Sequence, residues 1–235
     1  MVTRERLARQ LNDVMEREAE TYLSEVPFAS HLTDTTPLNR DYYLRHRIET
    51  VHRIRQTARI DALALARMLD EDYPAARHWG RYTCEELEHD QLYLSDLATH
   101  GFTEEQVLAT PLFNATGAML TYMIEALERW GSLAAVSYSI FVEWNSARYS
   151  AAAVEKASQA FSVKNVAGSK THLGIDEVED HYEVMVDIAY TLVEKDEERE
   201  RALFDMIGDY AKFFRQYFTE LYQSTVEPKP LKFAS

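Results

Sequence analysis

The sequence is poor in cysteine and in the residues that interrupt helices. Seven glycines and six prolines among 235 residues leave few natural breaks in the chain, so long helices are expected. The single cysteine, Cys84, excludes an intrachain disulfide framework and suits a reducing compartment. We interpret Cys84 as a small core residue.

Long apolar runs and a basic face are missing as well. No stretch approaches the roughly 18 apolar residues that a membrane span requires, and the first residues contain no apolar segment typical of a signal peptide. The 25 basic and 39 acidic residues give a formal charge of −14. Nucleic acid and anionic membranes attract basic faces, so we expect neither as a partner. We predict a cytoplasmic protein.

Apolar residues recur at helical spacing along most of the chain. They predict helices over about 4–23, 39–70, 75–99, 111–130, 132–161, 170–193 and 196–224. Several arginines fall on the polar face of the second of these helices. No strand pattern and no internal repeat is present. The fold class is therefore predicted as all-α: a single up-down bundle of about seven helices over residues 1–225, followed by a flexible tail over 226–235.

One segment, Thr171–Glu183, places a histidine and carboxylates at helical spacing. A helix advances about 100° per residue, so His172 and Asp176 share a face and Glu179 returns to it. Imidazole and carboxylate are ligands that suit non-haem iron, although acidic residues are usually solvated and the segment could be an exposed acidic face. His181 lies nine residues after His172, on the opposite face of a regular helix. We leave it out of the ligand set, since only a π-bulge would bring it round.

Two upstream positions add carboxylates and a second histidine. Glu86-x-x-His89 has the spacing used in carboxylate-bridged di-iron bundles, with Glu85 as a competitor for the same geometry. Such a spacing is also common by chance in a chain with 39 acidic residues. Glu143 lies in the apolar run 139–144, where an ionised carboxylate is costly unless it is paired or ligated. A salt bridge to an arginine of the second helix and ligation of a metal are both open for Glu143.

The order of these motifs resembles the haem-oxygenase-like di-iron oxidases and oxygenases, in the superfamily that includes TenA, PqqC and CADD. Glu-x-x-His is followed by a lone buried glutamate and then by His-x-x-x-Asp. The intervals, 54 residues from His89 to Glu143 and 29 from Glu143 to His172, also resemble those of the family. Residues 26–43 are similar to a segment near the start of the wider superfamily, so the resemblance spans about residues 20–220.

The resemblance implies two iron ions, Fe(II) or Fe(III), in each chain. The expected metal ligands are Glu86, His89, Glu143, His172, Asp176 and Glu179, of which the first five are also the expected catalytic residues. Glu143 would bridge the two ions, and His89 and His172 would each cap one. The family usually continues His-x-x-x-Asp-x-x-His, whereas this chain has Glu179 at the last position. A carboxylate there either binds iron or weakens the second site.

The function that the resemblance implies is O2-dependent oxidation of a small metabolite. N-oxygenation or oxidative cleavage of an amine or amino acid in a biosynthetic pathway is the leading hypothesis, and Tyr82 and Tyr138 could orient the substrate. Alternatives are a fatty-acid decarboxylase or desaturase of the same family, a metal-free thiaminase-like or PQQ-synthase-like enzyme, and a non-catalytic helical binding protein. The expected partners are the substrate, O2, an electron donor and a second copy in a homodimer.

Two other activities of the superfamily fit the sequence less well. Haem oxygenase needs a proximal histidine on its first helix, and residues 4–23 contain none. Thiaminase-like enzymes use a cysteine nucleophile, and the surroundings of Cys84 do not match that pattern.

Overall fold

A computed structural model describes residues 2–179 and 181–227, with only the backbone described at 175–179. The helices in chain order are α1 (Arg4–Glu25), α2 (Arg40–Glu71), α3 (Tyr73–Glu86), α4 (His89–Thr99), α5 (Glu104–Ala109), α6 (Asn114–Trp130), α7 (Leu133–Ala160), the 3-10 helix η1 (Val163–Val166), α8 (Ala167–Glu179), α9 (His181–Val193) and α10 (Glu197–Thr225). No strand occurs in the described ranges, so the predicted all-α fold class is confirmed.

Side-chain caps begin several of these helices. The Asn39 side chain accepts a hydrogen bond from the backbone N–H of Tyr42 (3.0 Å) at the start of α2, and Asp72 caps α3 in the same way. Thr103 and Gln106 form the capping box that opens α5. Such caps satisfy backbone donors that have no partner inside the helix. They explain why the beginnings of helices could be read from the sequence.

One helix that the sequence predicts as continuous is divided in the structure. The predicted helix over 75–99 breaks at Leu87 and Glu88, between α3 and α4. There the N–H of Glu88 bonds to the carbonyl of Glu85, and the N–H of Gln91 to that of Glu88, three residues back instead of four. The number of helices in the described part of the chain therefore exceeds the predicted number of about seven, because the helix over 75–99 is divided and the short helix α5 is added.

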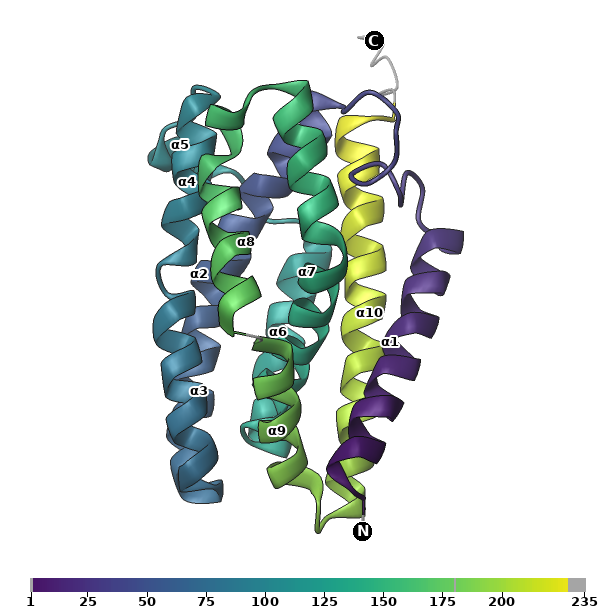
Figure 1. The fold of residues 1–235 in the computed structure, drawn as a ribbon, viewed down its shortest axis with the longest axis vertical. Helices are drawn as coiled ribbons and strands as arrows, with labels where there is room; N and C mark the ends of the chain where they lie inside the picture. Colours follow the sequence, from purple (N-terminus) through teal and green to yellow (C-terminus); the bar gives the residue numbers. More distant parts are fainter. Residues whose placement is uncertain (1, 180, 228–235) are drawn as a thin grey trace, which may run out of the picture.

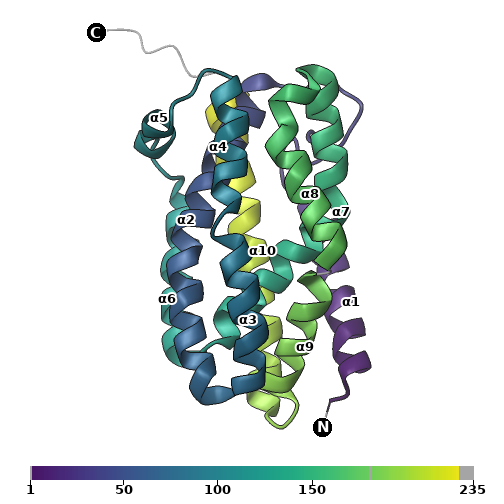
Figure 2. The same ribbon diagram turned by 60° about the vertical axis from the view of Figure 1, so that its left-hand side comes forward.

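The helices run roughly along one axis, with α1 and α10 on one side and α2, α3 and α4 on the other (Figure 1). The largest apolar core lies among α1, α3, α6, α9, α10 and the adjoining halves of α2 and α7. A second core joins the other halves of α2 and α7 to α4 and η1. In Figure 2, α8 and α9 follow one another along the bundle, as α3 and α4 do. The division between α3 and α4 thus lies near the junction of the two cores.

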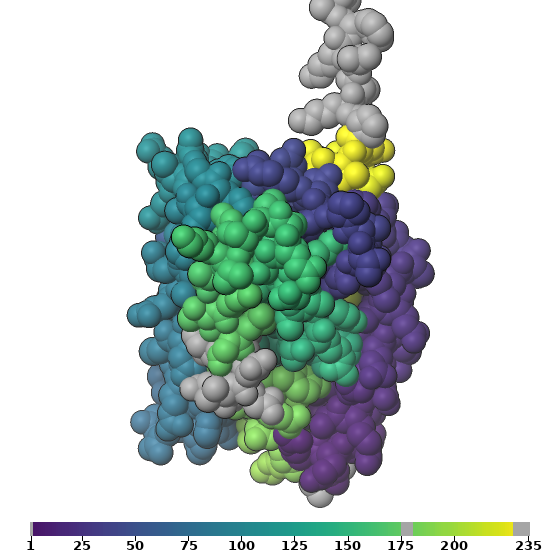
Figure 3. Space-filling view, turned by 45° about the horizontal axis from the view of Figure 1, so that its top comes forward, coloured from purple at the N-terminus to yellow at the C-terminus, as the bar shows by residue number. Residues whose placement is uncertain are grey.

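The surface view supports the same arrangement. α7 and α8 (green) cover the middle of the face shown in Figure 3, between α1 (purple) and the α3–α5 region (teal). Among the helices that the structure describes, none is both long enough and apolar enough to cross a lipid bilayer.

Candidate metal centre

Several titratable side chains lie near the junction of the two cores. Glu86 is the last residue of α3 and His89 the first of α4, while His181 begins α9. Glu143 lies in the middle of α7, and His172 lies in the second turn of α8. These five residues come from five helices and meet in one region.

Their side chains form two groups that share one carboxylate. In the first group, potential ligand atoms of Glu86, His89 and His172 all lie within 4.8 Å of one another. In the second group, the same holds for Glu86, Glu143 and His181. Each of the two oxygens of Glu86 faces a different histidine: Oε2 lies 3.0 Å from His89 Nδ1, and Oε1 lies 4.0 Å from His181 Nδ1. Glu86 is therefore the carboxylate that both groups share, whereas Glu143, which was expected to bridge the two ions, belongs to one group alone.

Contacts within each group are short enough for shared ligation. The imidazole rings of His89 and His172 have centroids 4.2 Å apart, and His181 Nδ1 lies 4.0 Å from Glu143 Oε2. The side chains of His89, His181 and Glu143 are only 3%, 4% and 8% exposed. Three histidines and two carboxylates in a largely buried site form a donor set that suits first-row divalent metals, iron among them.

Glu143 has a hydrogen-bond donor on the neighbouring helix. The hydroxyl of Tyr82 donates to Glu143 Oε1 at 2.9 Å, and both side chains are buried. Burial and the negative charge of Glu143 raise the pKa of Tyr82 well above its ordinary value, so this proton stays on the tyrosine. The arginines Arg45 and Arg55 of α2 pair elsewhere, with Glu49 and Asp90.

A further carboxylate, Asp61 of α2, lies beside this region. Its Oδ1 atom is buried and has no hydrogen-bond partner in the described structure. Burial and the nearby charge of Glu86 raise the pKa of Asp61 from 3.8 to about 8. The site thus concentrates negative charge in a dry setting, which favours either protonation or a bound cation.

His181 is the site residue that the sequence analysis left out. A regular helix continued from His172 would turn it to the opposite face, yet at the start of α9 it lies with Glu86 and Glu143. Its Nε2 atom also lies 3.2 Å from Oε2 of Glu85. The sequence did contain a signal, because His181 lies two positions after Glu179, where the motif His-x-x-x-Asp-x-x-His of the resembled family ends.

Two predicted ligands are outside what the structure describes. Asp176 and Glu179 belong to the backbone of α8, but their side chains lie outside the described residues. Their role as ligands therefore stays a prediction.

A cavity of about 290 Å³ adjoins the candidate metal centre and is lined by Glu86, Glu143 and His172. Tyr82 and Tyr138, named from the sequence as residues that could orient a substrate, also line it. The volume is at the lower end of the range for ligand sites in proteins. The space therefore suits a small molecule held next to the clustered side chains.

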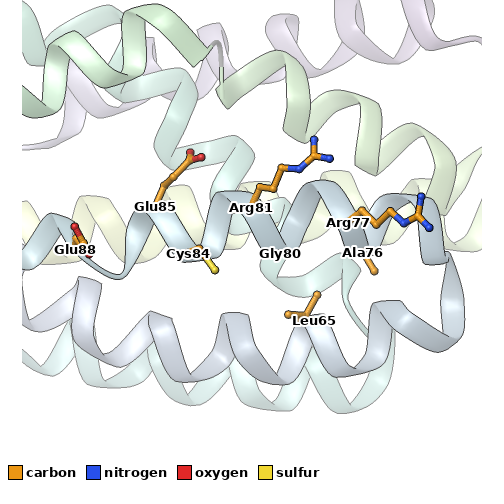
Figure 4. Close-up of a pocket in the computed structure, with 8 residues that line it drawn as sticks. All are labelled: Leu65, Ala76, Arg77, Gly80, Arg81, Cys84, Glu85 and Glu88. Atoms are coloured by element: carbon orange, nitrogen blue, oxygen red, sulfur yellow. The ribbon is translucent and has the colours of Figure 1, made fainter.

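An open groove on the outside of α3 is separate from this cavity (Figure 4). Its lining residues are Leu65, Ala76, Arg77, Gly80, Arg81, Cys84, Glu85 and Glu88. Cys84 is exposed there, so the prediction that it is a core residue is wrong. The small residues Ala76, Gly80 and Cys84 recur every four positions and leave space beside Leu65 of α2. The only cysteine of the chain is thus not among the residues that line the cavity.

No protein-family model matches the chain, and no curated protein matches its sequence. Solved structures do resemble it. A domain of unknown function with a haem oxygenase-like fold from Shewanella denitrificans OS217 has a TM-score of 0.77 and 18% identity, over 92% of each chain. A TenA homologue from Pseudomonas syringae pv. tomato DC3000 has a TM-score of 0.76 and 15% identity, over 94% of this chain and 96% of the other.

A third solved structure is also similar to this chain. It is a CADD-like protein of unknown function from Nostoc punctiforme PCC 73102, with a TM-score of 0.67 and 15% identity, over 95% of this chain and 99% of the other. At such identities the likeness establishes the fold and leaves the activity to be argued from the side chains.

Proposed function

We propose that this chain, which has the haem-oxygenase-like fold, is a non-haem di-iron oxidase or oxygenase that uses O2 to oxidise a small metabolite. The observation that carries the proposal is the position of Glu86, shared by two groups of potential ligands. One iron would be held by Glu86, His89 and His172, and the other by Glu86, Glu143 and His181. Asp176 and Glu179 are the further ligands that the sequence predicts for this site.

Bound iron would supply the electrons that reduce O2 and so enable attack on a C–H or N–H bond. The protein's own groups position and protect that chemistry. Tyr82 holds one oxygen of Glu143 through its hydroxyl, which fixes the orientation of the carboxylate. The burial of His89, His181 and Glu143 keeps water from these groups.

N-oxygenation or oxidative cleavage of an amine or amino acid is the preferred reaction, and fatty-acid decarboxylation or desaturation is the alternative. A cavity of about 290 Å³ favours a small substrate in either case. The proposed enzyme would also need an electron donor. We propose in addition that it is a homodimer and that it is cytoplasmic. The exposed position of Cys84 argues against a metal-free reaction that uses a cysteine nucleophile at this cavity.

The experiment is anaerobic loading of the purified chain with Fe(II), followed by gel filtration and measurement of iron and of O2 uptake. We expect about two iron ions per chain in the wild type. His89→Ala should lower the iron content and the O2 uptake. His78→Ala is the matched control, because His78 is an exposed residue of α3 and should retain both. Less than one iron per chain in the wild type, or activity that survives chelation, would contradict the proposal.

A further inference from the structure

Two arginines of α2 line the cavity beside the candidate metal centre. Arg47 and Arg53 are among its lining residues, together with Glu86 and His172. Arg47 is only 7% exposed and Arg53 is partly buried. Arginine is rarely buried without a partner, because its charge loses the solvation of water.

The donors of these two guanidinium groups are incompletely used. Arg47 Nε and Arg53 Nη1 are buried and have no hydrogen-bond partner in the described residues. Neither guanidinium forms an ion pair there, whereas Arg45 and Arg55 of the same helix lie 2.6 Å from Glu49 and Asp90. Asp96 and Glu49 act on Arg47 and Arg53 only through their charge, so neither arginine has a carboxylate at salt-bridge distance among the described residues.

Aromatic rings hold both groups without satisfying these donors. The Arg47 Cζ atom lies 5.1 Å from the ring centroids of Tyr43 and Tyr93. The Arg53 Cζ atom lies 4.7 Å from the ring centroid of Tyr217. A cation–π contact uses the face of an aromatic ring, while the N–H bonds of arginine point outward in the guanidinium plane. The aromatic contacts therefore hold both guanidinium groups in the wall of the cavity, and each keeps a donor without a partner in the described residues.

The arginines are one aromatic ring away from the candidate metal centre. The ring of Tyr93, which packs on Arg47, has its centroid 5.5 Å from that of His172. A small molecule that contacts Arg47 at one end can therefore reach the ligand cluster with its other end. The cavity lining also includes apolar residues such as Ile54 and Phe214, which suit a hydrocarbon body.

We propose that Arg47 and Arg53 bind the carboxylate of the substrate, so that the substrate is a small organic acid whose other end lies at Glu86 and His172. This inference rests on the proposed oxidase function. A carboxylate offers two acceptor oxygens in the geometry that guanidinium groups match. A phosphate is the competing anion, but the aromatic and aliphatic wall of the cavity favours an acid with an organic body.

The test measures binding to the 235-residue chain after removal of metal with a chelator. The probes are hexanoate, its neutral analogue hexanamide, and inorganic phosphate. Their binding is measured by thermal shift and by calorimetry. We expect hexanoate, and not hexanamide or phosphate, to raise the melting temperature of the wild type. Arg47→Gln and Arg53→Gln should weaken hexanoate binding by about tenfold or more, as expected for loss of a hydrogen bond to a charged group. Arg59→Gln, an exposed position of the same helix, is the matched control and should bind as the wild type does.

Several results would overturn the inference. Equal binding of hexanoate and hexanamide would show that the carboxylate is not recognised. Binding of phosphate as strong as that of hexanoate would show that the site is not specific for an organic acid. A purely structural role predicts that Arg47→Gln lowers the melting temperature without changing the hexanoate-dependent increase. If Arg47→Gln does not fold, Arg47→Lys keeps the charge but loses the planar donors, and hexanoate should bind it more weakly than the wild type.

The outcome also separates this inference from the oxidase proposal. Because binding is measured without metal, failure of iron loading would refute the oxidase and leave the carboxylate site intact. Normal iron content with no preference for hexanoate would refute the carboxylate site alone.

Discussion

Replacing Asp61 with asparagine should stabilise the metal-free protein, and the gain should grow with pH. The pKa of Asp61 is raised from 3.8 to about 8, chiefly by burial and secondly by Glu86. Below about pH 4 the carboxyl is protonated in both the folded and the unfolded chain, so it does not alter stability. As the pH rises from about 4 to 8, the unfolded chain releases this proton while the folded chain retains it. Folding stability is therefore lost progressively across this window and is constant above it.

The size of the effect follows from the shift of the pKa. Each pKa unit corresponds to about 1.4 kcal/mol, so the change from pH 4 to pH 7 should cost the wild type up to roughly 4 kcal/mol in unfolding free energy. Asparagine has nearly the same shape and never ionises, so Asp61→Asn should escape this loss. In a chain of this size, 1 kcal/mol corresponds to about 2–4 °C in melting temperature. The difference between variant and wild type should then approach about 8–16 °C at pH 7.

The assay is urea denaturation of chelated protein, followed by circular dichroism, at several values between pH 4.5 and 8. The quantity of interest is the variant-minus-wild-type difference, in which the titration of all other groups cancels. Asp70→Asn removes an exposed carboxylate from the same helix and should give a small difference that changes little with pH. A constant difference for Asp61→Asn over this range would show that Asp61 ionises normally, and the account of its buried charge would be wrong.

Three further substitutions test other parts of the site. Tyr82→Phe removes the hydrogen bond to buried Glu143 and should lower the unfolding free energy by about 2 kcal/mol, measured by urea denaturation; no change would mean that the bond does not form in solution. Gly168→Ala places a Cβ atom 2.0 Å from the backbone oxygen of Leu92, so a loss of about 3 kcal/mol is expected in the same assay, and a stable variant would contradict the close helix contact. His181→Ala should reduce iron content after Fe(II) loading by about one ion per chain, and wild-type content would exclude His181 as a ligand.

The fold was largely predictable because helical periodicity records burial directly. Leu203, Ile207 and Tyr210, for example, recur at spacings of three and four, and all three are buried on α10. The divisions between helices were not predictable from this pattern. Leu87 is apolar and continues the periodicity, yet it is 58% exposed at the break between α3 and α4. Apolar periodicity indicates which residues can be buried. It does not indicate where a backbone N–H bonds to the carbonyl three residues earlier instead of four.

The candidate site was predictable only in part, for the same physical reason. Glu86, His89, Glu143 and His172 were each named from local spacing or an apolar setting, and the structure brings them together. His181 was excluded because the spacing of a regular helix turns it away from His172. Arg47 was not named from the sequence, and it is buried. An arginine in a helical pattern is normally a surface residue, and only the tertiary structure shows that it lines a cavity.

Asp96 of α4 has a consequence for how the two imidazoles come together. Its carboxylate accepts hydrogen bonds from the backbone N–H groups of Gly168 and Ser169, at 2.7 and 2.8 Å, and from the Ser169 hydroxyl at 2.7 Å. These hydrogen bonds fix the position of α8 along the axis of α4. They therefore align His172 with His89, which lie within a few helical turns of Ser169 and Asp96. The conformational entropy of ordering the pair is lost when the chain folds, so an arriving cation would meet ligands that are already assembled.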